Sequence, residues 1–254
     1  MNAQWRLRIF LFAAAFFLFF YLAGAKNLPP WGHYRGPYGD MISSLSVFQR
    51  HTTDVVNAID YDYRGLDTLG EEFILFTSIL GVMLLLRNPK ASSAAAEGDE
   101  GLSETVRITA ACSFFLTFLF GLYMCTHGQL TPGGGFQGGV IVATALMLVY
   151  IAENLNRFKA ITSHPLMEVL EAAGAGFYAL IGISALFVGA PFLTNWLPLG
   201  KSGDVFSSGT IAVISASVGL EVASGFILLS YTYLEDIVSE QDDGGRSGAR
   251  RGEK

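Results

Sequence analysis

Residues 207–234 read SSGTIAVISASVGLEVASGFILLSYTYL. This apolar run contains a single charged residue, Glu221. Fourteen uncharged residues of this run precede the acid and thirteen follow it. A bilayer core about 30 Å thick needs about 20 apolar residues of helix, so the run is long enough to cross a membrane. The acid then lies near the middle of the lipid.

Five further apolar runs predict an all-α, polytopic membrane protein with six transmembrane helices. In lipid, a backbone satisfies its hydrogen bonds only as a helix or a closed barrel, and no segment alternates as barrel strands do. Charged residues make up 15% of the 254 residues, against roughly 25% in soluble domains. The net charge of -6 offers no basic surface for nucleic acid. The predicted spans are residues 7–25, 69–86, 105–126, 136–152, 166–193 and 207–234.

The distribution of Lys and Arg predicts the orientation. Six spans put both termini on one side of the membrane, and that side holds eleven of the sixteen basic residues. Because cytoplasmic loops carry the excess of basic residues, we expect a multi-pass protein of the cell (inner, cytoplasmic) membrane with both termini in the cytoplasm. The first run, preceded by Arg6 and Arg8, also resembles a signal peptide, but it is longer than a usual signal core and we expect it to be retained.

Composition divides the chain into four parts. Residues 1–87 form a two-span part and residues 105–234 a four-span part. Between them, residues 88–104 contain NPKASSAAAEGDEG, the small and polar composition of a cytoplasmic linker. Residues 235–254 are predicted to be a polar cytoplasmic tail.

Glu221 is the strongest functional signal. An acid at the centre of a spanning helix costs about 2.5–3.5 kcal/mol on insertion scales, so its side chain must face protein or water. Ser217 and Ser224 share its helical face, and we expect them to hydrogen-bond the carboxylate or hold water beside it. Two interpretations remain open: a position in an ion or proton path, or a protonated or paired contact between helices.

The second span predicts a further acid in the membrane. Residues 73–86 are uncharged and cover only about 21 Å as helix, less than the hydrocarbon core. The helix must therefore extend back through Glu72 and Glu71, which makes Glu71 a candidate stop for a proton or cation. Asp67 and Thr68 stand where a helix N-cap belongs, so capping is an alternative explanation for Asp67 and Glu72.

A glycine-rich segment separates the third and fourth spans. Residues 126–139 read THGQLTPGGGFQGG, which cannot continue an ordinary helix. We expect a broken or re-entrant turn before the fourth helix, tolerated where backbone is buried in protein or lines a wet cavity. His127 is a candidate proton relay, and an ordinary polar loop residue is the alternative. The turn residues are Pro132, Gly133, Gly134, Gly135, Phe136, Gly138 and Gly139.

The fifth span begins with ordinary helix signals. Ser163 and Pro165 predict its start, and we interpret Glu168 and Glu171 as interfacial acids favoured by the helix dipole. No motif for nucleophilic catalysis, dinucleotide binding or zinc occurs in the sequence. We therefore predict no catalytic residue, no metal, no cofactor and no self-contained enzyme.

Two stretches resemble a known family. Residues 55–73, VVNAIDYDYRGLDTLGEEF, are similar to the C-terminal region of the A subunit of Mrp-type multi-subunit cation/proton antiporters, and to the matching small subunit of membrane-bound hydrogenase-type complexes. Residues 127–141, HGQLTPGGGFQGGVI, resemble the PGGGFxGG signature of the antiporter's B subunit. The two-span and four-span parts therefore look like an A-type piece fused to a B-type piece.

The resemblance implies a membrane subunit that helps to carry Na⁺ or H⁺ beside larger antiporter-like subunits. It assigns Glu71 to the acid of the TLGE motif, with Asp67 as its neighbour, and residues 132–139 to the glycine-rich turn. Our own hypothesis is that Glu71 and Glu221 alternately bind and release a proton or Na⁺ in a wet interior path. The alternative is a structural membrane subunit of a redox-coupled, hydrogenase-type ion-pumping complex. The implied partners are other membrane subunits, the lipid bilayer and the transported ion, and no nucleic acid.

Overall fold

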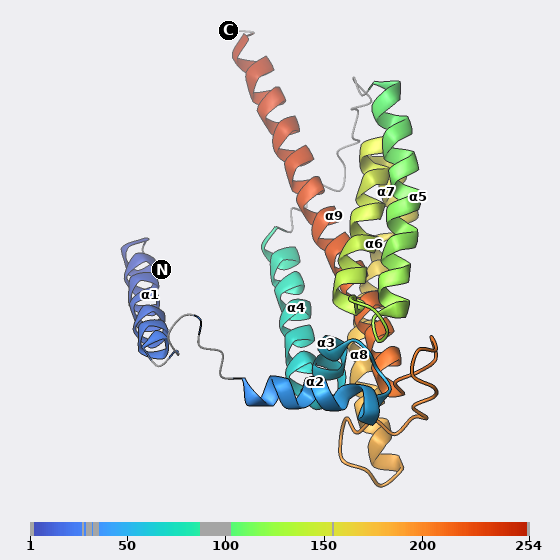
Figure 1. The fold of residues 1–254 in the computed structure, drawn as a ribbon. Helices are drawn as coiled ribbons and strands as arrows, with labels where there is room; N and C mark the ends of the chain where they lie inside the picture. Colours follow the sequence, from blue (N-terminus) through green and yellow to red (C-terminus); the bar gives the residue numbers. More distant parts are fainter. Residues whose placement is uncertain are drawn as a thin grey trace. The chain divides into compact units, whose positions relative to one another are not determined.

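The computed structural model describes residues 3–26, 28, 32, 36–86, 103–153 and 155–252, with side chains as far as residue 234. All regular structure in these residues is helical, and six helices are long and apolar enough to span a membrane (Figure 1). The prediction of an all-α chain with six spans is confirmed. Nearly all of the predicted linker, residues 88–102, lies outside the described residues. The side chains of the predicted tail also lie outside them.

The chain forms two units, Met1–Met41 and Ile42–Lys254. The first contains α1, Ala3–Ala25, whose described side chains are all exposed except that of Ala13. Phe12 and Phe17 are 75% and 73% exposed. A helix that is apolar on every face is stable in lipid or against another apolar helix, which agrees with its prediction as the first span.

The second unit begins with short helices that lead into the second span. Helix α2, Pro37–Arg50, crosses into this unit, and α3, Val55–Ala58, is followed by a π-helical turn, η1, at Ile59–Tyr63. Helix α4 then runs over Gly65–Leu85. It extends back through both glutamates as expected, but its N-cap is Arg64. The predicted cap at Asp67 and Thr68 is wrong, because η1 starts the helix one turn earlier.

Five helices complete the second unit: α5, Glu104–His127; α6, Gly135–Ala152; α7, Leu155–Ile161; α8, His164–Phe187; and α9, Thr210–Gly252. Ser163 is the N-cap of α8 and Pro165 lies in its first turn, as predicted. Helix α8 ends six residues before the predicted Leu193, because Gly189 adopts a φ of 76° and Pro191 follows. Helix α9 begins after Ser208 and Gly209, which also have positive φ.

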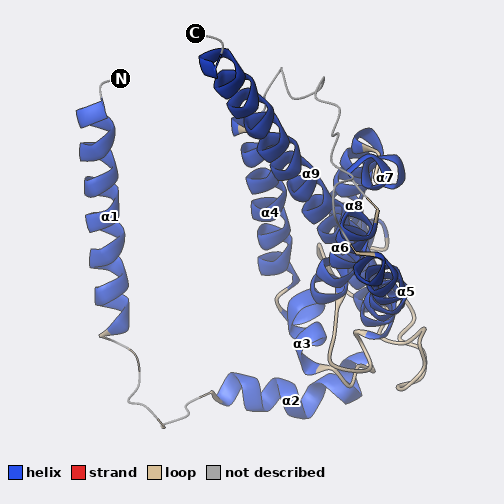
Figure 2. Cartoon of the chain, turned by 90° about the horizontal axis from the view of Figure 1, so that it is seen from above, coloured by secondary structure: helices blue, strands red, loops and turns tan. Residues whose placement is uncertain are grey.

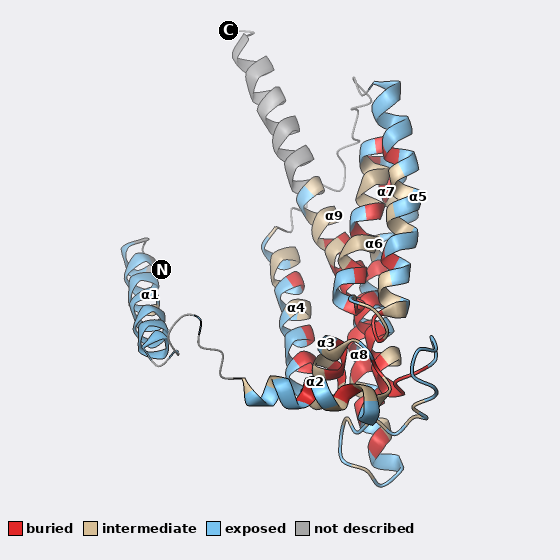
Figure 3. Ribbon diagram, in the orientation of Figure 1, coloured by how far each residue is buried: buried red, intermediate tan, exposed pale blue. Residues whose placement is uncertain are grey.

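Helix α9 is the centre of the second unit. It packs against α4, α5, α6 and α8, and it lies among these helices in both ribbon views (Figures 1 and 2). Within the candidate span Thr210–Leu234, 67% of the residues of the most apolar window are buried, against at most 33% in the other spans. Figure 3 shows this burial concentrated where α9 passes between α6 and α8.

The loops at one end of the unit are hydrogen-bonded to one another. This loop end comprises residues 51–54, 128–134 and 195–209. The imidazole of His51 donates from Nδ1 to the Gly200 carbonyl at 2.7 Å, and the Ser208 hydroxyl donates to the His51 carbonyl at 3.1 Å. The Gln129 amide donates to the Val205 carbonyl at 2.6 Å. The bonds connect the segments that lead into α3, α6 and α9.

Close contact between α8 and α9 depends on Gly174. A Cβ atom at this position would lie 2.7 Å from the backbone nitrogen of Glu221, whereas a Cβ at Gly176 would meet nothing within 4 Å. We expect G174A to force the helices apart and to lower the free energy of unfolding by about 1–3 kcal/mol. The matched G176A should change it little or raise it by a few tenths. Thermal unfolding in detergent compares them, and equal midpoints would contradict the tight contact.

Candidate functional site

Glu221 lies in the middle of the α9 span, wholly enclosed by protein. Its exposed fraction is 0%, and Gly174 of α8 packs directly against its backbone. The predicted serine partners bind backbone instead: Ser217 donates to the Gly174 carbonyl at 2.8 Å, and Ser224 donates to the Leu220 carbonyl at 2.6 Å. The expectation that these hydroxyls bind the carboxylate is therefore wrong, because helix carbonyls compete for them.

Glu72 of α4 faces Glu221. It is 1% exposed, and the two side chains are near enough to hydrogen-bond when a proton lies between them. In the described part of the chain, none of the four carboxyl oxygens of this pair meets a hydrogen-bond donor. The pair therefore combines two buried acids from two helices with no compensating group.

Glu171 of α8 adds a third buried acid. It is 1% exposed, and its Oε1 also lacks a donor among the described residues. A Cβ at Gly225 would lie 3.1 Å from this oxygen. Gly225 is one helical turn, about 5.4 Å, beyond Glu221 on α9. Glu72, Glu221 and Glu171 thus form a line of acids across α4, α9 and α8, which we call the acid line.

Electrostatics forbids full ionisation of the acid line. Two like charges about 4 Å apart repel by about 4 kcal/mol even at an effective dielectric constant of 20. The ion pairs between described residues lie elsewhere, at Arg50–Asp62, Arg64–Asp67, Arg107–Glu153 and His164–Glu168. The acid line must therefore hold at least one proton or a bound cation. The described residues show no cluster of three acids, histidines or cysteines that converges on a metal.

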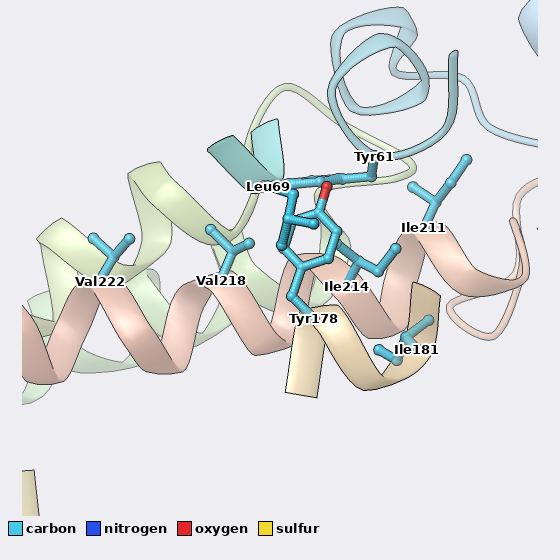
Figure 4. Close-up of a cluster of buried hydrophobic side chains, with 8 residues drawn as sticks. All are labelled: Tyr61, Leu69, Tyr178, Ile181, Ile211, Ile214, Val218 and Val222. Carbon is cyan, nitrogen blue, oxygen red and sulfur yellow. The ribbon is translucent and has the colours of Figure 1, made fainter. Parts of the chain in front are cut away.

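Apolar clusters lie on both sides of the acid line. Toward the loop end, Leu69, Tyr178 and Val218 belong to a cluster on α4, α8 and α9 (Figure 4). On the other side, Ile79, Met167 and Ile227 of the same helices belong to a second cluster. The full loop-end cluster is Tyr61, Leu69, Tyr178, Ile181, Ile211, Ile214, Val218 and Val222. The full distal cluster is Ile79, Ala143, Leu155, Phe158, Met167, Ile227 and Leu228.

Tyr61 connects the acid line with the glycine-rich turn. Its hydroxyl hydrogen-bonds with the Gly135 backbone and the Ser215 side chain, and burial raises its pKa. Tyr178 donates to the Gly65 carbonyl at 2.8 Å. Figure 4 shows the Tyr178 side chain directed toward Tyr61 and Leu69. The two phenols therefore close the loop end of the site while their polar atoms are satisfied.

The glycine-rich segment forms a compact turn between α5 and α6. Helix α6 begins at Gly135, and its cap Gly134 has a φ of 143°, a conformation that suits glycine. The predicted break before the fourth helix is thus confirmed. Gly135 and Gly139 let α6 approach α9: a Cβ at either position would lie less than 3 Å from atoms of α9.

Asn57 holds this turn in place. Its Nδ2 donates to the Gly133 carbonyl at 2.9 Å and also to the Gly128 carbonyl. We expect N57L to leave these buried carbonyls unpaired, at a cost of about 1–3 kcal/mol, and to speed deuterium exchange in residues 128–134. Gln49, an exposed amide, provides the control: Q49L should leave exchange in the turn unchanged. Slow exchange in N57L would mean that other contacts fix the turn.

The other candidates from the sequence lie away from the acid line. Glu71 is exposed, next to buried Glu72. Asp67 is exposed and pairs with Arg64. His127, half-buried, ends α5 and stacks on Tyr123 with ring centres 4.6 Å apart. The pKa of Asp60, in η1, is raised, first because the carboxyl group is partly buried and then because the charges of Glu71 and Asp54 act on it.

Sequence reasoning missed Glu72 and Glu171 as buried acids. A signal for Glu72 was present, since Leu69, Glu72 and Ile79 recur at the spacing of one helical face and all three are buried. For Glu171 the signal was weaker. It lies seven residues beyond His164, about 10 Å into the helix, which is deeper than an interfacial acid needs to be.

Known proteins resemble the four-span part of the chain. Residues 105–228 match the family described as a domain related to the MnhB subunit of Na⁺/H⁺ antiporter. The chain is 36% identical over 83 residues to the B subunit of the Na(+)/H(+) antiporter of Bacillus subtilis, covering 32% of this chain and 56% of that protein. It is 28% identical over 166 residues to the probable A/B subunit of a K(+)/H(+) antiporter of Rhizobium meliloti, covering 56% of this chain and 16% of that protein.

Solved structures show the same fold over a longer stretch. A chain of the membrane-bound sulfane sulfur reductase, an archaeal respiratory membrane complex, is 29% identical with a TM-score of 0.70, covering 89% of this chain and 97% of that chain. A chain of the Mrp complex from Dietzia sp. DQ12-45-1b shares the fold at 23% identity with a TM-score of 0.66, covering 89% and 26%. This protein is therefore a multi-pass membrane protein, and its residues 105–228 match the model of a domain related to the MnhB subunit of Na⁺/H⁺ antiporter.

Proposed function

We propose that this chain is a membrane subunit of a multi-subunit cation/proton antiporter complex, and that Glu72 and Glu221 form part of its proton or cation path. The observation that carries the proposal is the buried pair of acids from α4 and α9, whose oxygens lack donors among the described residues. Acids at this depth are costly. A cost that no salt bridge offsets is expected where protons or cations bind and leave.

The path begins, in this proposal, near the sequence candidates at the loop end. Glu71 and Asp67 are exposed on the first turns of α4, where a neighbouring protein of the complex can supply the rest of a route. Glu72, the next residue, carries the proton or cation inward to Glu221. His127 ends α5 beside the glycine-rich turn. In this proposal its imidazole passes protons to or from the path at the loop end. In the proposed orientation both termini are in the cytoplasm, which places the loop end outside.

The chain joins an A-type part and a B-type part, which supports a position for the acid pair where these two antiporter parts meet. We infer that residues 1–87 are an A-type part and residues 105–234 a B-type part, joined by the linker 88–104. The likeness to an antiporter protein whose name combines the A and B subunits supports this inference. Because α4 of the first part contributes Glu72 and α9 of the second contributes Glu221, the acid pair joins the two parts.

Membership of a redox-coupled ion-pumping complex is the second candidate. The match to nearly the whole length of a chain from a respiratory membrane complex favours it. In either complex the chain serves transport and is not a self-contained enzyme. Mild-detergent purification through a tag on this chain, followed by mass identification, separates the two. Iron–sulfur or other electron-carrying subunits among the partners would favour the redox complex, and membrane subunits alone would favour the antiporter.

A deletion tests the proposal as a whole. Vesicles from cells that lack this chain should lose cation-driven proton movement, and expression of the full chain should restore it. Normal transport without the chain would overturn the proposal.

A further inference from the structure

Helix α8 carries titratable residues from the acid line to its own beginning. Glu171, Glu168 and His164 are spaced by three and four residues, so they lie on one helical face. Glu171 is buried, while the side chains of Glu168 and His164 are 52% and 32% exposed. His164 Nδ1 lies 3.4 Å from Glu168 Oε1. Within about 10 Å of helix, the face therefore passes from a buried carboxyl group to partly exposed polar side chains at the start of α8.

The opposite end of this face reaches Glu221. Glu171 touches α9 at Gly225, and Gly174, one turn further along α8, touches Glu221 itself. The charge of Glu171 acts on Glu221, and that of Glu168 acts on Glu171. His164, Glu168 and Glu171 thus follow one another along one face of α8, and the contacts at Gly225 and Gly174 bring that face against α9 beside Glu221. The tight contact through glycine is what brings them together.

The interpretation of these acids as helix-dipole partners does not account for Glu171, and the first turn of α8 contains no acid. A dipole contact is strongest within the first turn, at a solvated surface. Glu171 is the eighth residue of α8, beyond its second turn, is 1% exposed and has an oxygen without a donor among the described residues. Burying a carboxyl group in this way is unfavourable for stability alone. Its position beside Glu221 gives a functional reason to keep it.

We propose that Glu171 is a proton-binding position next to Glu221, and that Glu168 and His164 connect it to the water at the His164 end of α8. This rests on the proposed function and gives the path its second opening. A proton leaves the Glu221 carboxyl for the Glu171 carboxylate, which leaves Glu221 charged and Glu171 neutral. It passes on to the Glu168 carboxylate and then to the neutral imidazole of His164, each donor regaining its former state when the next proton arrives.

The surroundings of His164 fit an opening at the membrane surface. The ring of His164 meets Tyr231 edge-on with centres 5.1 Å apart, and Lys159 Nζ lies 4.9 Å from the centre of the same tyrosine ring. These groups are polar or amphipathic, whereas the distal cluster beside them is apolar. The α8 face is thus a polar route past that cluster.

The test compares E171Q with E171D in vesicles that contain the assembled complex. If Glu171 binds protons, E171Q should slow cation-driven proton movement at least tenfold, and E171D, which still titrates, should keep a larger part of the rate. A structural role predicts the reverse order, because Gln keeps the size and hydrogen-bonding capacity of Glu. E171Q at the normal rate, or E171Q faster than E171D, would overturn the proposal.

A second set of variants serves if E171Q fails to assemble. The double variant E168Q/H164A changes one exposed and one half-buried side chain at the start of α8 and should leave assembly intact, as a native gel can verify. We expect a two- to fivefold lower rate, since surface water partly replaces the missing groups. An unchanged rate would overturn the relay. E221Q, measured in parallel, separates a failure of the α8 relay from a failure of the proposed function. If E221Q loses transport while the α8 variants keep normal rates, only the α8 relay is refuted. If all variants keep normal rates, the proposed function is refuted as well.

Discussion

Replacement of Glu221 by Gln should abolish cation-driven proton movement, with a loss of at least 100-fold, while the complex still assembles. The amide has the size of the carboxyl group and is neutral, as a protonated Glu221 would be. Packing against Gly174 is therefore preserved, and only the ability to release a proton or bind a cation is lost. The rate is measured in inverted membrane vesicles by the quenching of a pH-sensitive dye when Na⁺ or K⁺ is added.

The control for this variant is E104Q. Glu104 lies in the first turn of α5 and is exposed, so its replacement should leave the rate near normal. A native gel checks that both variants enter the complex in equal amounts. Full transport by an assembled E221Q complex would remove Glu221 from the mechanism and favour the interpretation of the acid as a contact between helices.

Replacement of Glu72 by Gln should reduce transport at least tenfold more than replacement of its neighbour Glu71. Glu72 is buried against Glu221, and its neutralisation removes one of two proton-binding groups from the pair. Glu71 is exposed, so water or a partner's groups can take over part of its role. The two variants differ by one position on the same helix and make the same chemical change.

The opposite order of effects would be equally informative. If E71Q stops transport and E72Q does not, the route follows the TLGE acid along the surface of α4, and the buried pair serves assembly. Loss of the complex on a native gel in E72Q, together with normal transport by any assembled remainder, would also assign Glu72 to assembly. If the two acids act in one path, the double variant E71Q/E72Q should lose no more transport than the more severe single variant.

The six spans were predictable because each is a long apolar run, and the break at Pro132 was predictable from composition. The rotation of α4 had only one local signal in the sequence, the spacing of Leu69, Glu72 and Ile79. Glu71 and Glu72 differ by about 100° around α4, and their directions depend on where α4 starts. The π-helical turn η1 places an extra residue in the preceding turn, and no local pattern at residues 59–63 announces it. The buried acid was therefore assigned to the neighbouring residue.

The burial of Glu171 could not be predicted from the sequence for a different reason. Its burial results from the approach of α8 to α9 through Gly174 and Gly225, residues separated by a long loop from one another. The limits of α8 and α9 likewise depend on backbone turns at Gly189 and Ser208, where positive φ ends one helix and precedes the next. Hydropathy alone extends α8 too far, because Pro191, Phe192 and Leu193 are apolar but not helical, and it starts α9 three residues too early, at Ser207.

The loop-end and distal clusters enclose the acid line on all three of its helices. Because the α8 face offers a polar route past the distal cluster, the loop-end cluster is the remaining apolar barrier. We therefore expect the isolated chain not to conduct, so that cells can make it ahead of its partners without a proton leak that would drain the membrane's stored energy.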